Sequence, residues 1–265
     1  ELSYMLIMAQ LQPGQNWVKA VATNGSQQAR DSVEIYLRGP VTIAELPSGV
    51  HNGINYMNDS TVTLVLHDPT GFKQFVYAIG EFNNWEISNE NYMKRTADGK
   101  RYWLTLTGLT PQYEYAYQYY IDGELKIADA YAEKVLDPWN DQYISSSIYP
   151  NPKPYPSAYT DGVVSIFQTA RPAYNWQVPN FIPPAINNAQ SDLVIYELLI
   201  RDFIETHSIS DVQQKLDYLK NLGVNAIELM PIAEFDGNES WGYSTNFFFA
   251  SDKYYGTRDA YKAFI

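Results

Sequence analysis

The chain has 265 residues, enough for one large domain or for two to three domains of ordinary size, ~100 to 200 residues each. It carries 18 Lys and Arg against 30 Asp and Glu, so its formal net charge is -12 and nucleic acid, a polyanion, would be repelled. Cysteine is absent, which excludes disulfides and thiolate chemistry. Only 18% of the residues are charged while 23 are Tyr, a composition that favours neutral polar ligands.

Up to about residue 185 the sequence predicts an all-β region. Short runs of β-branched and aromatic residues, such as 16–22, 32–37, 61–66, 75–79 and 163–168, are separated by turn residues. Three dipeptides typical of turns or hairpins lie among them: Asn24-Gly25, Asp98-Gly99 and Asp122-Gly123. We expect residues 1–39 to be part of one β-sandwich and residues 40–187 to form a second, immunoglobulin-like sandwich plus a linker that contains Pro179, Pro183 and Pro184.

After a domain boundary predicted near residue 188, the pattern changes to that of a parallel sheet with helices. Residues 193–200 form a near-continuous apolar run and residues 226–230 a second one, as expected of strands covered on both faces. Between them, Ser210 and Gln213 predict a helix start by a capping box, and Gly223 predicts its end. A further helix is expected after Thr257, with Tyr261, Phe264 and Ile265 on its apolar side. Strand, helix and strand together predict a right-handed βαβ unit.

Several motifs in the last 75 residues occur in an order that is specific to one family. Residues 222–225 read LGVN, 228–234 read ELMPIAE, 241–246 read WGYSTN and 254–256 read YYG. With the strand that ends at Tyr196 and Glu197, they resemble the opening of the α-amylase family, glycoside hydrolase family 13. Residues 82–85, FNNW, and 119–123, YYIDG, resemble the β-sandwich module of the glycogen-binding type that precedes the barrel in many of its members.

The resemblance implies a multidomain fold, with N-terminal all-β immunoglobulin-like sandwiches followed by the first βαβ units of a (β/α)8 TIM barrel over residues 188–265. Active sites of such barrels lie at the C-terminal ends of the strands. In the family, the aromatic residue matching Tyr243 forms a stacking platform for the sugar at the cleavage subsite. Trp241 lies in the same loop. Both are predicted substrate-binding residues, with packing of loop aromatics as the alternative.

In the sandwich, Trp85 matches an aromatic residue that contacts glucan in glycogen-binding relatives, and it is the third predicted substrate-binding residue. Two neighbouring positions depart from that pattern, because Gln118 replaces a Lys and Leu125 replaces a Trp. The alternative is that Trp85 packs in the core or at a domain contact. We therefore expect this sandwich to dock on the barrel rather than to bind glucan alone.

The family cleaves glycosidic bonds by a retaining mechanism that needs two carboxylates, ~5 to 5.5 Å apart, at later barrel strands. These would lie beyond residue 265, so the resemblance predicts a portion of an enzyme acting on α-1,4-glucans such as starch or glycogen, with the 265 residues inactive by themselves. No catalytic residue is named. Two alternatives stay open: a non-catalytic starch-binding surface protein, in which aromatic faces hold polysaccharide, and a glucan branching enzyme that transfers rather than hydrolyses.

The remaining expectations concern cofactors, partners and location. No cofactor or metal site is predicted, since the three His residues lie far apart in sequence and the family's calcium sites, in full-length enzymes, depend largely on later barrel residues. The expected partner is an α-glucan, with no nucleic acid and no membrane span, and self-association would cover the incomplete barrel. The Tyr-rich surface predicts a periplasmic, cell-surface or secreted protein, whereas a branching enzyme would be cytoplasmic.

Overall fold

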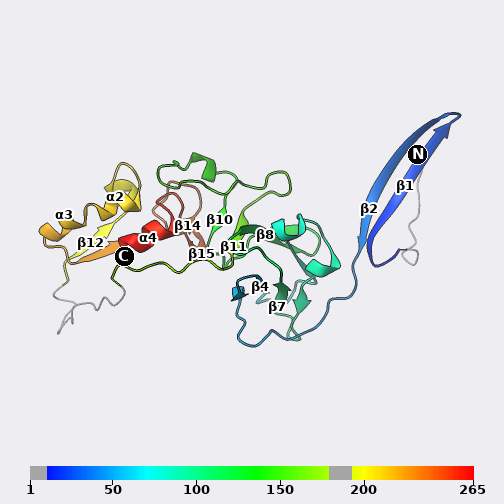
Figure 1. Ribbon diagram of the computed structural model, residues 1–265, viewed down its shortest axis with the longest axis horizontal. Coiled ribbons are helices and arrows are strands. Elements are labelled where there is room, and N and C mark those ends of the chain that lie inside the picture. The colour runs from blue at the N-terminus through cyan, green and yellow to red at the C-terminus, as the bar shows by residue number, and fades with distance from the viewer. Residues whose placement is uncertain (1–10, 179–192) are drawn as a thin grey trace.

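The fold is that of a computed structural model, in which residues 11–178 and 193–265 are described. A long β-hairpin, a β-sandwich and a smaller region of helices and strands follow one another along the chain (Figure 1). No helix among the described residues is long and apolar enough to cross a membrane. The predicted linker prolines and the boundary near residue 188 lie outside the described residues, so the domain limits stay predictions.

The central part consists of two packed antiparallel sheets. The four-stranded sheet has the order β3-β4-β7-β6 and the five-stranded sheet the order β10-β11-β8-β5, with β9 paired to β8. Their strands are β3 (Gly53–Asn58), β4 (Thr61–His67), β5 (Val76–Gly80), β6 (Lys94–Arg95), β7 (Arg101–Leu106), β8 (Glu114–Ile121), β9 (Leu125–Ile127), β10 (Val135–Leu136) and β11 (Val164–Gln168). Short 3-10 helices lie between strands: η2 (Glu81–Asn83), η3 (Asn89–Asn91) and η4 (Asp141–Tyr143).

The two sheets of the sandwich share one apolar core. Leu64 of β4 and Leu104 of β7 face each other across one sheet and pack against Tyr119 of β8 and Phe167 of β11 from the other. The Asp122-Gly123 hairpin is confirmed, since both residues have positive φ, 54° and 80°, between β8 and β9. A β-rich sandwich is therefore observed, whereas its assignment to the immunoglobulin-like class stays a prediction.

The N-terminal hairpin consists of β1 (Gly14–Asn24) and β2 (Gln27–Leu37), which pair along their full length. The Asn24-Gly25 turn joins them, as predicted. Within the described residues these strands pair only with each other, and most of their side chains are exposed. At the base of the hairpin the Tyr36 hydroxyl donates to Asn89 Oδ1 at 3.0 Å, which ties it to the sandwich. A partial sandwich over residues 1–39 stays a prediction.

The C-terminal region contains the predicted βαβ unit. β12 (Ile195–Leu198) and β13 (Ala226–Leu229) pair in parallel, with Leu198 opposite Leu229. Helices α1 (Ile200–Phe203), α2 (Ile209–Gln213) and α3 (Leu216–Asn221) connect them. An antiparallel pair, β14 (Ala233–Phe235) and β15 (Thr245–Ser251), and helix α4 (Arg258–Phe264) follow. Further barrel strands stay a prediction.

Two local predictions in this region are wrong. One helix from a capping box at Ser210 was expected, but Ser208 precedes α2, makes no side-chain cap, and the helix is interrupted at Lys215, whose φ and ψ are -98° and 2°. The start is fixed by a tertiary contact, because the Ile209 amide donates to the Tyr255 carbonyl at 2.9 Å. Ile265 is 85% exposed rather than on the packed face of α4. The start of that helix is as predicted, and Thr257 Oγ1 caps it by accepting from the Ala260 amide.

Candidate functional site

The candidate site lies where the two parallel strands end. Because β12 and β13 are in register, the segments that follow Leu198 and Leu229 start at the same edge of the sheet. These segments are α1 on one side and residues 230–256 on the other. In an α/β structure this edge is where ligands bind, so side chains exposed there are candidates for substrate contact.

Trp241 and Tyr243 lie at this edge, in the loop of residues 236–244. The sequence placed this loop directly after the second strand, but the strand β14 intervenes and the loop joins β14 to β15. The two side chains are 62% and 68% exposed, and neither ring stacks on another ring of the described chain. We call residues 236–244 the rim loop. It presents two unoccupied aromatic faces.

Gly242 holds the rim loop against the end of β13. Its φ is +91°, and a Cβ atom at this position would lie 2.3 Å from the carbonyl oxygen of Pro231. Only glycine combines this backbone conformation with such a close approach. The Gly242 amide donates to Ser240 Oγ at 3.0 Å, and Thr245 Oγ1 donates to the Gly242 carbonyl at 3.0 Å. The backbone that carries both aromatic rings is therefore fixed by local bonds.

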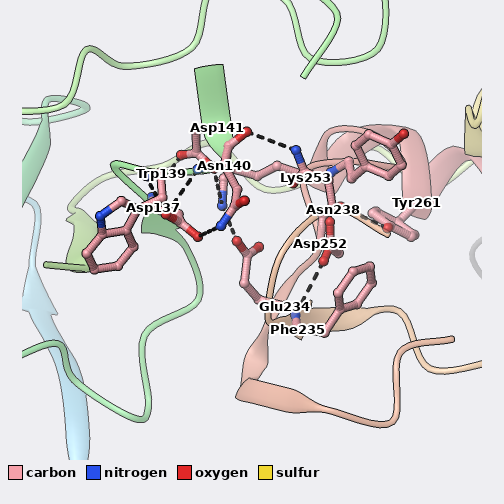
Figure 2. A network of polar contacts seen from close by, with 11 residues as sticks. Asp137, Trp139, Asn140, Asp141, Glu234, Phe235, Asn238, Asp252, Lys253 and Tyr261 are labelled. Carbon is pink, nitrogen blue, oxygen red and sulfur yellow. Dashed lines mark hydrogen bonds and ion pairs between the residues drawn. The ribbon is translucent and has the colours of Figure 1, made fainter. Parts of the chain in front are cut away.

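A buried charge cluster lies beneath the rim loop and joins it to the sandwich (Figure 2). The Lys253 ammonium, whose side chain is 5% exposed, pairs with Glu234 of β14 and, at 3.3 Å, with Asp141 of η4. Next to it, Asp252 accepts from the amides of Phe235 and Tyr254. We call Lys253, Glu234, Asp141 and Asp252 the Lys253 cluster. One cation and three carboxylates thus meet at the contact between the sandwich and the C-terminal region.

Burial dominates the electrostatics of this cluster. It raises the pKa of Glu234 from 4.5 to about 7 and that of Asp252 from 3.8 to about 6. Burial alone would lower the pKa of Lys253, but Glu234 and Asp141 reverse this and raise it, so the ammonium stays charged. With one positive charge against three carboxyl groups, the cluster takes up a proton at a higher pH than isolated carboxyl groups would.

The rim loop itself also touches the sandwich. The Asn238 side chain donates to the Asn140 carbonyl at 2.9 Å, next to Asp141 (Figure 2). At a second contact, Tyr131 of the sandwich stacks on Phe249 of β15, with ring centroids 5.3 Å apart. The expectation that the sandwich docks on the C-terminal region agrees with these contacts. Sequence motifs gave no signal for them, because the partners are about a hundred residues apart.

Trp85 occupies a different part of the molecule. Its ring packs against the outer face of the five-stranded sheet, next to Ala116 and Ile166, and its indole nitrogen is buried with no hydrogen-bond partner in the described chain. Gln118 lies on the same face of β8 as Ala116, is 1% exposed and donates to the carbonyls of Asp161 and Val163, so the segment of residues 161–163 covers it. The structure does not bring Trp85 and the rim loop together into one site.

Two further ionisable groups at the strand ends, His207 and Arg201, have partners in the structure. His207, with φ of 57°, shares a hydrogen bond of 2.9 Å with the Tyr254 hydroxyl, and Arg201 donates to Asp202 at 2.8 Å. Within residues 11–178 and 193–265, no three His, Asp or Glu side chains are grouped so that they could hold a metal ion. At the rim loop, the exposed rings of Trp241 and Tyr243 offer stacking and hydrogen bonding to a ligand.

Comparison with known proteins places the C-terminal region in a family. The family model "Alpha amylase, catalytic domain" matches residues 203–265. A malto-oligosyltrehalose trehalohydrolase of Saccharolobus solfataricus is 35% identical over 114 residues, which cover 43% of this chain and 20% of the relative. The chloroplastic isoamylase 1 of Oryza sativa subsp. japonica is 37% identical over 133 residues, with 43% of this chain and 16% of the relative covered.

Solved structures share the fold. A putative alpha amylase from Salmonella typhimurium superposes with a TM-score of 0.58 at 24% identity, over 81% of this chain and 30% of the other. A type I pullulanase from Bacillus subtilis, complexed with maltose, superposes with a TM-score of 0.52 at 17% identity, over 93% of this chain and 39% of the other.

These matches and the motifs at residues 222–256 agree in assigning the C-terminal region, residues 203–265, to the alpha-amylase family, glycoside hydrolase family 13. The chain spans no more than a fifth of the length of the two curated relatives.

Proposed function

We propose that this chain is part of a glycoside hydrolase that acts on α-1,4-linked glucans, and that the rim loop contacts the sugar. The relatives are named for glucan-active enzymes, an isoamylase and a malto-oligosyltrehalose trehalohydrolase, and the Bacillus subtilis pullulanase is a complex with maltose. The observation that carries the proposal is Tyr243, 68% exposed on a loop fixed at the C-terminal edge of parallel strands.

The physical basis of the contact is stacking. The C–H face of a glucose ring packs on a flat apolar ring, while its hydroxyl groups form hydrogen bonds around the edge. Because Gly242 and Ser240 fix the backbone, Tyr243 loses little conformational freedom beyond its own side-chain rotation when sugar binds. Trp241 offers a second face on the same loop, which suits a chain of glucose units better than a single one.

The cleavage itself is assigned to carboxylates outside these residues. We infer a retaining mechanism with two carboxylates, as the family resemblance implies, and name none of the acids of this chain as catalytic. Among the described acids, Glu234 and Asp252 belong to the buried Lys253 cluster, which docks the sandwich. The 265 residues by themselves are therefore proposed to bind glucan without hydrolysing it, so incubation with starch is expected to release no reducing sugar above a blank.

A matched set of variants tests the proposal by affinity electrophoresis in gels that contain amylopectin. Tyr243→Ala is expected to reduce retardation, corresponding to a roughly three- to tenfold weaker affinity for about 1 kcal/mol of lost stacking. Tyr159→Ala is the control, because Tyr159 is 61% exposed but lies on the sandwich. Retardation of Tyr243→Ala equal to that of the unchanged chain would refute the role of the rim loop.

The same gels address the alternative of a glucan-binding sandwich. Trp85 stays a predicted sugar contact, although its ring packs partly on Ala116 and Ile166. If Trp85→Ala abolishes retardation while Tyr243→Ala does not, a non-catalytic starch-binding protein is the better description. Two further points stay proposals. One is transfer rather than hydrolysis, as in branching enzymes, which the activity of the whole protein would test. The other is a periplasmic, cell-surface or secreted location, which localisation of the whole protein would test.

A further inference from the structure

A cavity lies away from the rim loop, between the sandwich, the segment after β11 and helix α4. It encloses about 360 Å³ and continues into a smaller recess of about 100 Å³. Its walls come from β3, β8, residues 133–134, residues 170–174 and α4. Its size is that of a small-molecule site at a domain interface. Trp241 and Tyr243 are not among its lining residues, so a ligand of this cleft would bind independently of the proposed glucan contact.

The charge of this cleft is opposite to that of the whole chain. Six ionised side chains line it, four of them cationic and two carboxylate: Lys134, Arg171, Arg258, Lys262, Glu114 and Glu133. The whole chain, in contrast, carries 18 basic against 30 acidic residues. A cleft with low-dielectric walls focuses such a local charge, so an anion is attracted here although the molecule as a whole repels it.

Two of the four cations are candidates for binding an anion. Lys134 contacts both oxygens of Glu114 at 2.8 Å, and Arg258 pairs with Glu133, so these four charges cancel within the walls. Arg171 makes a single bond of 3.1 Å, to Asp259, and these side chains are 34% and 63% exposed.

Lys262 is the second candidate cation of the cleft. It has no ion pair in the described chain and lies over the ring of Tyr174 at 5.5 Å. Arg171 and Lys262 thus keep donors available to a ligand.

The backbone next to Arg171 is held in an unusual conformation. Ala170, in the cleft wall, has φ of 51°, a left-handed conformation that costs a non-glycine residue roughly 1–2 kcal/mol. It turns the chain at the end of β11, so that Arg171 reaches Asp259 of α4. Strained backbone of this kind points to a functional constraint on the segment.

We propose that this cleft binds the phosphate group of a small ring-bearing molecule through Arg171 and Lys262. A phosphate monoester carries nearly two negative charges near neutral pH, which matches the two cations that keep donors available. The Arg guanidinium fits phosphate oxygens in a bidentate arrangement, and the Lys ammonium adds a point charge. Tyr56 and Tyr174 line the same cleft and offer ring surface to the rest of the molecule. A neutral sugar would leave the Lys262 ammonium without a counterion, whereas Arg171 is already paired with Asp259.

Isothermal titration calorimetry of the chain at low ionic strength tests this with three probes: glucose 6-phosphate, inorganic phosphate and glucose. Glucose 6-phosphate is expected to bind at least ten times more tightly than glucose, and inorganic phosphate to compete with it. The phosphate proposal is overturned if glucose binds equally well or if glucose 6-phosphate gives no binding signal. If inorganic phosphate binds as tightly as glucose 6-phosphate, the contribution of the ring is overturned.

Single substitutions locate the site. Lys262→Gln and Arg171→Gln are each expected to weaken binding of glucose 6-phosphate on the order of tenfold, as for loss of a charged hydrogen bond. Lys215→Gln is the control, because Lys215 is exposed on the α2–α3 connection, outside the cleft, and makes the same change of charge. Because Arg171 also pairs with Asp259, the folding of Arg171→Gln must be checked by circular dichroism. If Arg171→Gln is not folded like the unchanged chain, the result for Lys262→Gln alone decides. An equal loss in Lys215→Gln would overturn the assignment.

Discussion

Replacing Lys253 by Met removes the only cation of the Lys253 cluster while keeping the side-chain volume. Glu234 and Asp141 are then left close together, with side chains only 10% and 22% exposed. Removing one partner of a buried ion pair costs about 3–5 kcal/mol, because the remaining charge is neither hydrated nor compensated. We expect a loss of this size at pH 8 in the stability of the C-terminal region. At pH 5 the loss is smaller, since protonation of the carboxyl groups relieves the repulsion.

Hydrogen exchange followed by mass spectrometry measures this loss in the peptides that cover β14 and β15. A loss of about 3–5 kcal/mol corresponds to protection lower by roughly a hundred- to a few-thousand-fold at pH 8. Peptides of β4 and β7 in the sandwich serve as an internal reference. Lys215→Met is the control, because Lys215 is exposed and makes no ion pair among the described residues. A change of less than tenfold in β14 and β15, or an equal change in Lys215→Met, would show that the buried ion pairs do not hold this region together.

Two further predictions concern the same region. Because the pKa of Glu234 is raised from 4.5 to about 7, its contribution to the free energy of unfolding is complete below about pH 4.5 and is lost as the pH rises through 7, a difference of about 3 kcal/mol. Glu234→Gln should therefore remove this contribution from the change in urea midpoint between pH 5 and pH 8. An unchanged pH dependence of the midpoint in Glu234→Gln would contradict the assignment. Gly242→Ala should displace the rim loop and weaken retardation in amylopectin gels, because its Cβ would lie 2.3 Å from the Pro231 carbonyl oxygen. Gly237→Ala is the control: Gly237 also has a positive φ, +77°, but its Cβ would have nothing within 4 Å, so retardation should be reduced less. Equal reductions in the two variants would refute the close-contact argument.

Much of the secondary structure could be predicted from the sequence because it depends on local patterns. The apolar runs around Ile195 and Ala226 became parallel strands, and the Asp122-Gly123 dipeptide formed a hairpin turn. Helix α4 begins after Thr257, as the apolar positions that follow it predicted. The capping box at Ser210 failed because the Tyr255 carbonyl, 46 residues further on in the chain, fixes the start of α2 instead.

The rim loop could be located from the sequence, but the contacts that hold it in place could not be predicted. The motif at residues 241–246 identified Tyr243, and the structure added that Gly242 packs on Pro231 and that β14 separates the rim loop from the second strand.

The sequence by itself thus determined the β-rich and βαβ character of the chain and the family of its C-terminal region, through turn residues, apolar periodicity and contiguous motifs. Only the tertiary structure decided that Lys253 pairs with Asp141, 112 residues away, and that Arg171 and Lys262 line one cleft. The physical reason is that burial and electrostatic pairing depend on which distant segments pack together, and a sequence pattern of a few residues carries no information on that packing.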